Sequence, residues 1–233
     1  MIASILVILL TAIAPVALLM WWVNRKDSTR PEPVKMLVKG FFYGLVSVFL
    51  SLGFSMGINE LGLSFADSTS LEGQIAEAFF GAALPEEVAK LIMLWLLLRR
   101  NKYYDEYFDG IVYAACIGLG FAGFENIFYL VGEKDWLSIG VVRAFVSVPG
   151  HLSFAVAMGY FYSHCKFGVH KNAWTYICVL LVPVLAHWIF DALLMGAGVV
   201  SDTMSLVFVV VFSFFLRFLY NRTMHRIHKL EDM

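Results

Sequence analysis

The chain has 233 residues, of which 60% are hydrophobic and 15% are charged, and its mean hydropathy is +0.76. Soluble globular domains are about 45–50% apolar and about 25% charged, so this composition excludes a water-soluble globular protein and places the chain in a lipid bilayer. The formal net charge of −1 provides no basic surface for nucleic acid, and no nucleic-acid partner is expected.

Seven apolar stretches are long enough to cross the hydrocarbon core as helices, which takes about 20 residues each. They lie at about residues 2–23, 36–58, 76–98, 108–131, 137–162, 173–197 and 203–220. No internal repeat or shift in composition marks a second unit. We therefore expect a single membrane-embedded domain over residues 1–233, an all-α polytopic transmembrane helix bundle of about seven spans.

Basic residues are concentrated in every second connection between these stretches. They are Arg25, Lys26, Arg30, Lys35 and Lys39 after the first, Arg99, Arg100 and Lys102 after the third, Lys166 and Lys171 after the fifth, and Arg217, Arg222, Arg226 and Lys229 in the tail. The opposite connections hold Lys134 as their one basic residue. Because basic loops stay in the cytoplasm, we expect the N-terminus outside and the C-terminus in the cytoplasm. Bases that follow the first stretch are also typical of an uncleaved anchor.

Small residues recur in the apolar stretches, and cysteines are few. Gly40-xxx-Gly44 and Gly53-xxx-Gly57 in the second stretch are patterns that let membrane helices approach closely. The three cysteines are Cys116, Cys165 and Cys178. Their odd number and lack of CxxC spacing predict packing residues rather than a disulfide framework or a thiolate metal site.

Ionisable and amide side chains lie inside four of the spans, where charges are costly and usually face a bundle interior or a watered cavity. They are Glu86, Glu87 and Lys90 in the third span, Glu125 and Asn126 in the fourth, Arg143 and His151 in the fifth, and His187 and Asp191 in the sixth. At about 1.5 Å of rise per residue, the carboxylates and histidines fall in one layer roughly 9 to 21 Å below the outer edge. This shared depth predicts one polar site built by four helices.

Spacing within the third and sixth spans pairs these side chains. Lys90 follows Glu86 by four residues and Glu87 by three, so it can neutralise either carboxylate on a shared helix face. Repulsion between the two adjacent glutamates suits one of them to proton transfer near neutral pH. His187 and Asp191 are four residues apart, so the carboxylate can fix the imidazole tautomer or both can face one ion.

Two further residues border this site. Pro85 lacks an N–H, and we expect it to disturb the helix just before Glu86 and so to admit water. Arg143 is near the outer end of its span, where the simplest interpretation is charge balance with Asp135 or with a lipid headgroup.

The charged motifs resemble those of the PrsW family of intramembrane proteases. They are P-E-E-x-x-K with Glu86, Glu87 and Lys90, F-x-x-x-E-N with Glu125 and Asn126, P-x-H with His151, and H-x-x-x-D with His187 and Asp191. They occur in this order over about residues 36–197, each on a predicted helix. The resemblance implies that these residues form the catalytic site of a multi-pass protease in a bacterial plasma membrane.

The resemblance also implies a substrate and a mechanism. Proteins of this family make the first cut, the site-1 cut, on the extracytoplasmic side of a membrane-spanning anti-sigma factor, which frees a sigma factor. The partners would be that transmembrane substrate and the lipid bilayer. The family is classed as metallopeptidase and is distantly similar to the CAAX prenyl endopeptidase and bacteriocin-processing superfamily, which implies Glu86, supported by Glu87, as the general base.

Two versions of this chemistry stay open. In one, Zn²⁺ held by Glu125, His151 and His187 polarises the attacking water. In the other, no metal is present and Glu125 shares the role of base. The oxyanion would then be stabilised by His187 and Asp191, or by Asn126.

Two other classes of protein use intramembrane charges. A transporter could couple them to proton or ion movement, although the stretches show no repeated halves. A catalytically silent scaffold or immunity protein would keep the fold but would be expected to have lost a motif carboxylate or histidine, and none is missing here.

Overall fold

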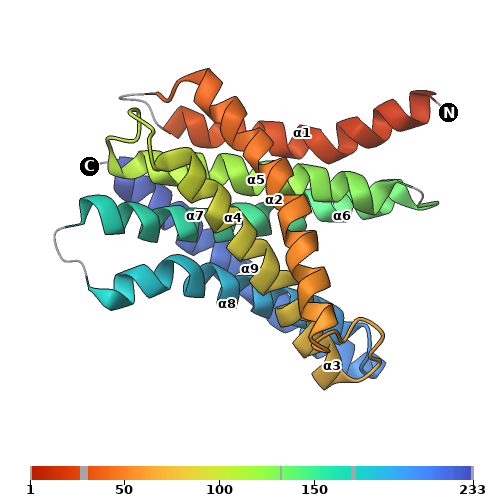
Figure 1. The fold of residues 1–233 in the computed structure, drawn as a ribbon. Coiled ribbons are helices and arrows are strands. Elements are labelled where there is room, and N and C mark those ends of the chain that lie inside the picture. The colour runs from red at the N-terminus through yellow and green to blue at the C-terminus, as the bar shows by residue number, and fades with distance from the viewer. Residues whose placement is uncertain (1, 27–30, 132, 169–171, 232–233) are drawn as a thin grey trace.

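The computed structural model describes residues 2–26, 31–131, 133–168 and 172–231, and these residues form helices without any strand (Figure 1). In chain order the helices are α1 (Ile2–Lys26), α2 (Val34–Glu60), α3 (Leu71–Glu77), η1 (Ala78–Ala83), α4 (Leu84–Leu98), α5 (Tyr107–Leu130), α6 (Trp136–Phe145), α7 (Ser147–Phe167), α8 (Ala173–Ala197) and α9 (Asp202–Glu231). The predicted all-α polytopic bundle is confirmed.

Six helical segments of the described residues are long and apolar enough to cross a membrane. They are Val7–Lys26, Val34–Glu60, Tyr107–Leu130, Trp136–Phe167, Ala173–Ala197 and Asp202–His225. The predicted span at residues 76–98 is helical but is not one regular α-helix, and it is not among these six segments. That stretch comprises the end of α3, the whole of η1 and the whole of α4, and α4 itself has only 15 residues. The interruption coincides with Pro85 and the two glutamates that follow it.

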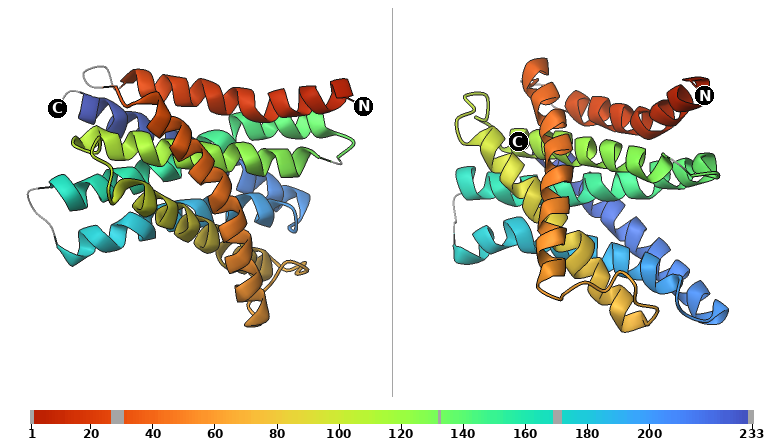
Figure 2. Two further views of the ribbon diagram at one scale, coloured as in Figure 1. Left: turned by 45° about the horizontal axis from the view of Figure 1, so that its top comes forward. Right: turned by 45° about the vertical axis from the view of Figure 1, so that its right-hand side comes forward.

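Helix α5 is the centre of the bundle. It is apolar around nearly its whole circumference and most of its residues are buried, as expected for a helix that other helices surround. Helices α7, α2 and α1 pack against it, and Figures 1 and 2 show it running between α1 and α7. Each helix that carries a polar residue of the predicted site is thus placed on or near one central element.

The contact between α2 and α5 depends on glycine. A Cβ atom at Gly44 would lie 2.4 Å from the carbonyl oxygen of Ile117, and one at Gly120 would lie 2.3 Å from the carbonyl oxygen of Phe41. The two backbones therefore touch, as the small-residue pattern predicts. No described atom lies within 4 Å of a Cβ built at Gly53 or Gly57, so the second pattern makes no close contact with the part of the chain that the structure describes.

The two ends of the bundle differ in charge. The C-terminal ends of α1, α4, α7 and α9 gather at one end, whereas the N-terminus and the turn from α5 to α6 lie at the other (Figures 1 and 2). The first of these ends is the basic one, because it carries Arg25, Lys26, Arg99 and Lys166.

Replacing Gly44 with alanine is expected to lower the free energy of unfolding by roughly 1–3 kcal/mol, because the added methyl group meets the backbone of α5. The measurement is the thermal unfolding midpoint of the purified protein in detergent. Gly53→Ala is the matched control on the same helix and is expected to leave the midpoint unchanged. Equal shifts for the two variants would contradict the α2–α5 contact.

Candidate active site

A break in the regular helix places the first two glutamates. Pro85 has no N–H to donate to the carbonyl of Gly81, four residues earlier, and the Ser55 hydroxyl of α2 donates to that carbonyl instead, at 3.0 Å. The residues before it, Ala78–Ala83, form the π-helix η1, a form of helix found frequently at functional sites. The predicted disturbance at Pro85 is confirmed, and Glu86 and Glu87 begin the regular helix that follows.

The ammonium group of Lys90 lies within a buried cluster of charges. Its Nζ is 2.8 Å from Glu87 Oε1 and 3.2 Å from Glu86 Oε2. It is also 3.1 Å from His151 Nδ1 on α7, and it lies over the ring of Phe121. The predicted pairing of Lys90 with both glutamates is thus confirmed. Because an unpaired charge inside a membrane is costly, the two glutamates on the same helix stabilise this ammonium, and its contact with His151 connects α4 to α7.

His187 connects the same cluster to α8. Its Nδ1 is 2.9 Å from Glu87 Oε1, and its Nε2 is 3.1 Å from Asp191 Oδ2 and 3.9 Å from Glu86 Oε2. The imidazole stacks on the ring of Phe154, with centroids 4.6 Å apart. Since carboxylates face both ring nitrogens, the arrangement is satisfied by an imidazolium that donates from both, or by a cation at one of them.

His151 connects the cluster to α5. Its Nε2 is 3.1 Å from Glu125 Oε2, while its Nδ1 faces the Lys90 ammonium. Because an ammonium can only donate, Nδ1 is the acceptor and the ring carries its proton on Nε2, where it donates to Glu125. The carboxylate therefore fixes the tautomer and orientation of this histidine.

Arg143 is part of the site, which the sequence interpretation missed. Its Nη2 donates to Glu125 Oε2 and its Nε donates to Asn126 Oδ1 at 2.6 Å. The expected partner, Asp135, instead accepts a hydrogen bond from Ser138 at 2.9 Å. The sequence places Arg143 in the same outer part of the membrane as Glu125, which made this pair a candidate. Depth alone, however, does not determine toward which neighbouring helix a side chain points.

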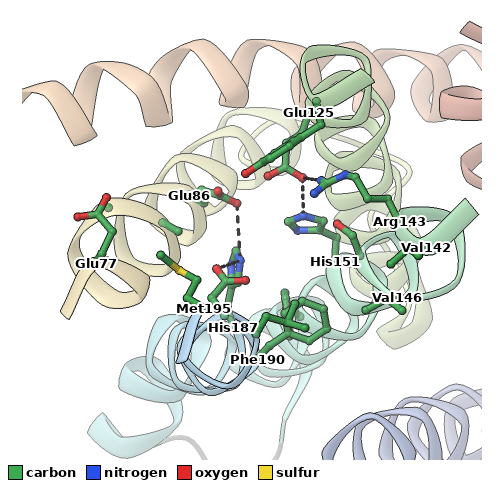
Figure 3. A pocket seen from close by; sticks show the side chains of 17 residues that line it. Glu77, Glu86, Glu125, Val142, Arg143, Val146, His151, His187, Phe190 and Met195 are labelled. Carbon is green, nitrogen blue, oxygen red and sulfur yellow. Dashed lines mark hydrogen bonds and ion pairs between the residues drawn. The ribbon is translucent and has the colours of Figure 1, made fainter. Parts of the chain in front are cut away.

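A cavity of about 470 Å³ brings most of these groups to one space. Its polar lining is Glu77, Glu86, Glu125, Tyr129, Arg143, Ser147, His151, His187 and Asp191, and Figure 3 shows Glu86, Glu125, His151 and His187 around it. The convergence predicted from depth is confirmed. Glu87, Lys90 and Asn126 do not line the cavity. Glu77, which was not predicted, lines it at the end of α3 and accepts a hydrogen bond from the backbone N–H of Phe65 at 2.8 Å.

Four of these residues could hold a metal ion. Glu86, Glu87, His151 and His187 each offer a ligand atom, and these atoms all lie within 4.8 Å of one another. Imidazole and carboxylate are ligand types that zinc uses. Glu87 Oε2 is buried and accepts no hydrogen bond from any described residue, so it is an acceptor that lacks a partner.

The charge of the site also fits a divalent cation. Its four carboxylates, Glu86, Glu87, Glu125 and Asp191, face two permanent cations, Lys90 and Arg143, which leaves an excess of negative charge inside the membrane. The predicted ligand set shares His151 and His187 with the four-residue cluster. The predicted set includes Glu125 as its carboxylate, whereas the cluster includes Glu86 and Glu87 instead.

A bundle of membrane-spanning helices around a cavity with paired carboxylates and histidines defines a membrane-embedded hydrolase, since these are the groups that activate water.

The family model described as PrsW family intramembrane metalloprotease matches residues 32–218. Protease PrsW of Clostridioides difficile (strain 630) is 34% identical over 207 residues, which cover 87% of this chain and 85% of that protein. Protease PrsW of Bacillus subtilis (strain 168) is 31% identical over 188 residues, which cover 80% of this chain and 82% of that protein. No solved structure matches the chain.

The chain belongs to the PrsW family of intramembrane metalloproteases. It is a multi-pass protease of a bacterial membrane. Membership of a protease family favours the enzyme over the transporter and the silent scaffold, and five motif residues, Glu86, Glu125, His151, His187 and Asp191, line one cavity.

Replacing Arg143 with glutamine is expected to lower the rate of substrate cleavage by on the order of tenfold or more, because Glu125 loses the partner of its buried charge. The measurement is cleavage by purified protein, compared with Lys134→Gln, which removes an exposed base from the same end of the bundle. Unchanged cleavage by Arg143→Gln would contradict a role for this residue in holding Glu125.

Proposed function

We propose that the protein cuts a single-span membrane protein on the extracytoplasmic side, as the site-1 protease of a membrane-spanning anti-sigma factor. The observation that carries the proposal is the convergence of Glu86, His151 and His187 from three helices on one cavity. The cavity lies toward the end of the bundle opposite the basic one. With the basic end in the cytoplasm, the cavity is nearer the outer face, where a site-1 cut takes place.

Glu86 is the general base in this proposal. Its side chain is 13% exposed and lines the cavity, whereas that of Glu87 is 0% exposed and accepts from both Lys90 and His187. A base must reach the water from which it takes a proton, so Glu86 acts directly. Glu87 supports it through Lys90, whose ammonium holds both carboxylates in place.

We assign His151, His187 and Glu87 as ligands of a Zn²⁺ ion, which would replace the Lys90 ammonium as the partner of His151 Nδ1, with Glu125 orienting His151. The two histidines are common to the predicted set and to the cluster, and the unpartnered Oε2 of Glu87 supports this residue as the carboxylate ligand. Glu125 contacts the histidine as carboxylates commonly contact metal-binding imidazoles. When bound, the ion supplies Lewis-acid polarisation of a water and of the scissile carbonyl. Asp191 orients His187 in the same way.

Proteolysis is tested by co-expression with a tagged single-span anti-sigma factor. The wild type and the exposed control Glu72→Gln are expected to shorten the substrate from its outer side. Glu86→Gln and His187→Ala are expected to lose at least roughly 10²-fold in cleavage, because each removes a group that acts on the water.

Two outcomes would contradict separate parts of the proposal. Shortening by Glu86→Gln to the extent seen for the wild type would overturn the site assignment. If the wild type leaves the anti-sigma factor intact but cuts another single-span protein, the proposed substrate class would be overturned and the site assignment would stand.

The ligand assignment is tested by measuring the metal content of purified variants. Wild type and Glu125→Gln are expected to retain about one zinc ion per chain, and Glu87→Gln and His187→Ala to lose it. Loss of zinc from Glu125→Gln with retention in Glu87→Gln would restore the set predicted from the sequence. Full cleavage after chelation, with no metal left in the protein, would establish the metal-free version.

A further inference from the structure

A second large cavity lies at the basic end of the bundle, away from the active site. This groove has a volume of about 700 Å³ and is lined by residues of α4, α7, α8 and the segment between α4 and α5. The same three helices carry Glu86, His151 and His187 farther along their length, nearer the other end of the bundle. None of the residues that line the groove lines the catalytic cavity.

The groove has an apolar floor and an aromatic rim. Leu91, Ile92 and Val179 form part of the floor. Trp95 and Tyr176 are 49% and 57% exposed and stand near the basic ends of α4 and α8. Aromatic side chains at this level of a membrane protein lie where lipid headgroups meet hydrocarbon.

Two cations from different helices border the groove. The Arg99 guanidinium, at the end of α4, lies 4.8 Å from the centre of the Trp95 ring. The Lys166 ammonium, on α7, lies 3.9 Å from the centre of the Tyr104 ring and donates to the Tyr104 carbonyl. These cation–π contacts restrict both side chains to the neighbourhood of the groove.

The side chains that line the groove differ in charge from those of the catalytic cavity. The described residues that border the groove include no aspartate or glutamate. Burial raises the pKa of the Tyr104 hydroxyl well above its usual range, so this group stays neutral. The catalytic cavity, lined by four carboxylates including Glu77, has the opposite character.

We propose that this groove binds one anionic phospholipid, with the phosphodiester between Arg99 and Lys166 and an acyl chain along the apolar floor. A guanidinium can donate two parallel hydrogen bonds to a phosphate, and basic pockets between membrane helices on the cytoplasmic side bind anionic headgroups. The exposed Trp95 and Tyr176 of its lining are side chains typical of the membrane interface, where lipid is the molecule available to fill the groove. Charge complementarity selects an anionic lipid over a zwitterionic one.

The test is native mass spectrometry of the full-length protein in detergent with equal amounts of dioleoylphosphatidylglycerol and dioleoylphosphatidylcholine. The wild type is expected to retain phosphatidylglycerol preferentially. Replacing both Arg99 and Lys166 with glutamine is expected to lower this retention about 30-fold, since each of the two bases near a membrane surface adds about 1 kcal/mol. The matched control replaces Arg100 and Lys102, which lie on the same connection but outside the groove lining.

A third variant separates a built site from diffuse surface charge. Ile92→Trp fills the floor of the groove without altering any charge and is expected to weaken retention as well. Elution volume and thermal unfolding midpoint show that each variant is folded. Equal loss in both glutamine double variants, or full retention by Ile92→Trp, would overturn the proposal. So would photocrosslinking at residue 92 that captures a helix of the protein substrate instead of lipid.

Discussion

The rest of the site depends on the pairing of the Lys90 ammonium. This group contacts Glu86 and Glu87 on its own helix and His151 on α7, and Glu87 extends the contact to His187 on α8. A buried polar group that loses a hydrogen-bond partner costs free energy, and separating α7 or α8 from α4 would take such a partner from Lys90 or from Glu87. The same requirement that stabilises these helices against one another therefore brings carboxylates and histidines to one cavity.

The π-helix η1, which departs from regular α-helical backbone, lines this cavity. Non-helical or distorted backbone inside a membrane is tolerated where it is buried in protein or lines a watered space. The π-helix η1 meets this condition, because Gly81 and Ala82 line the cavity and Ser55 satisfies the carbonyl that Pro85 leaves free. The close packing of α2 on α5 then fixes the element that carries Glu125. A protease requires this combination, since its water must enter a bundle that stays closed elsewhere.

The sequence predicts what depth and hydrophobicity determine, and little that depends on rotation. Stretches of sufficient length give the all-α class, and the rise of a helix places Glu86, Glu125 and His187 in one layer, so their convergence follows from the sequence. Rotation about the helix axis is not encoded by depth, which is why the partners of Arg143 were missed. Average hydropathy also cannot distinguish a continuous helix from a broken one at residues 76–98. For that reason the position of Glu77 on the cavity wall, where α3 meets the π-helix η1, was not expected.

A double-mutant cycle on Lys90 and Glu87 tests most directly whether the charges of this cluster compensate one another. The quantity measured is the free energy of unfolding of the wild type, Lys90→Gln, Glu87→Gln and the double variant. Each single variant removes one member of the Lys90–Glu87 pair, whose charged atoms are 2.8 Å apart, so the double variant should be more stable than the sum of the two single effects by at least about 1 kcal/mol. Additive effects would mean that the two groups do not interact, and the pairing of the Lys90 ammonium on which this account depends would be contradicted.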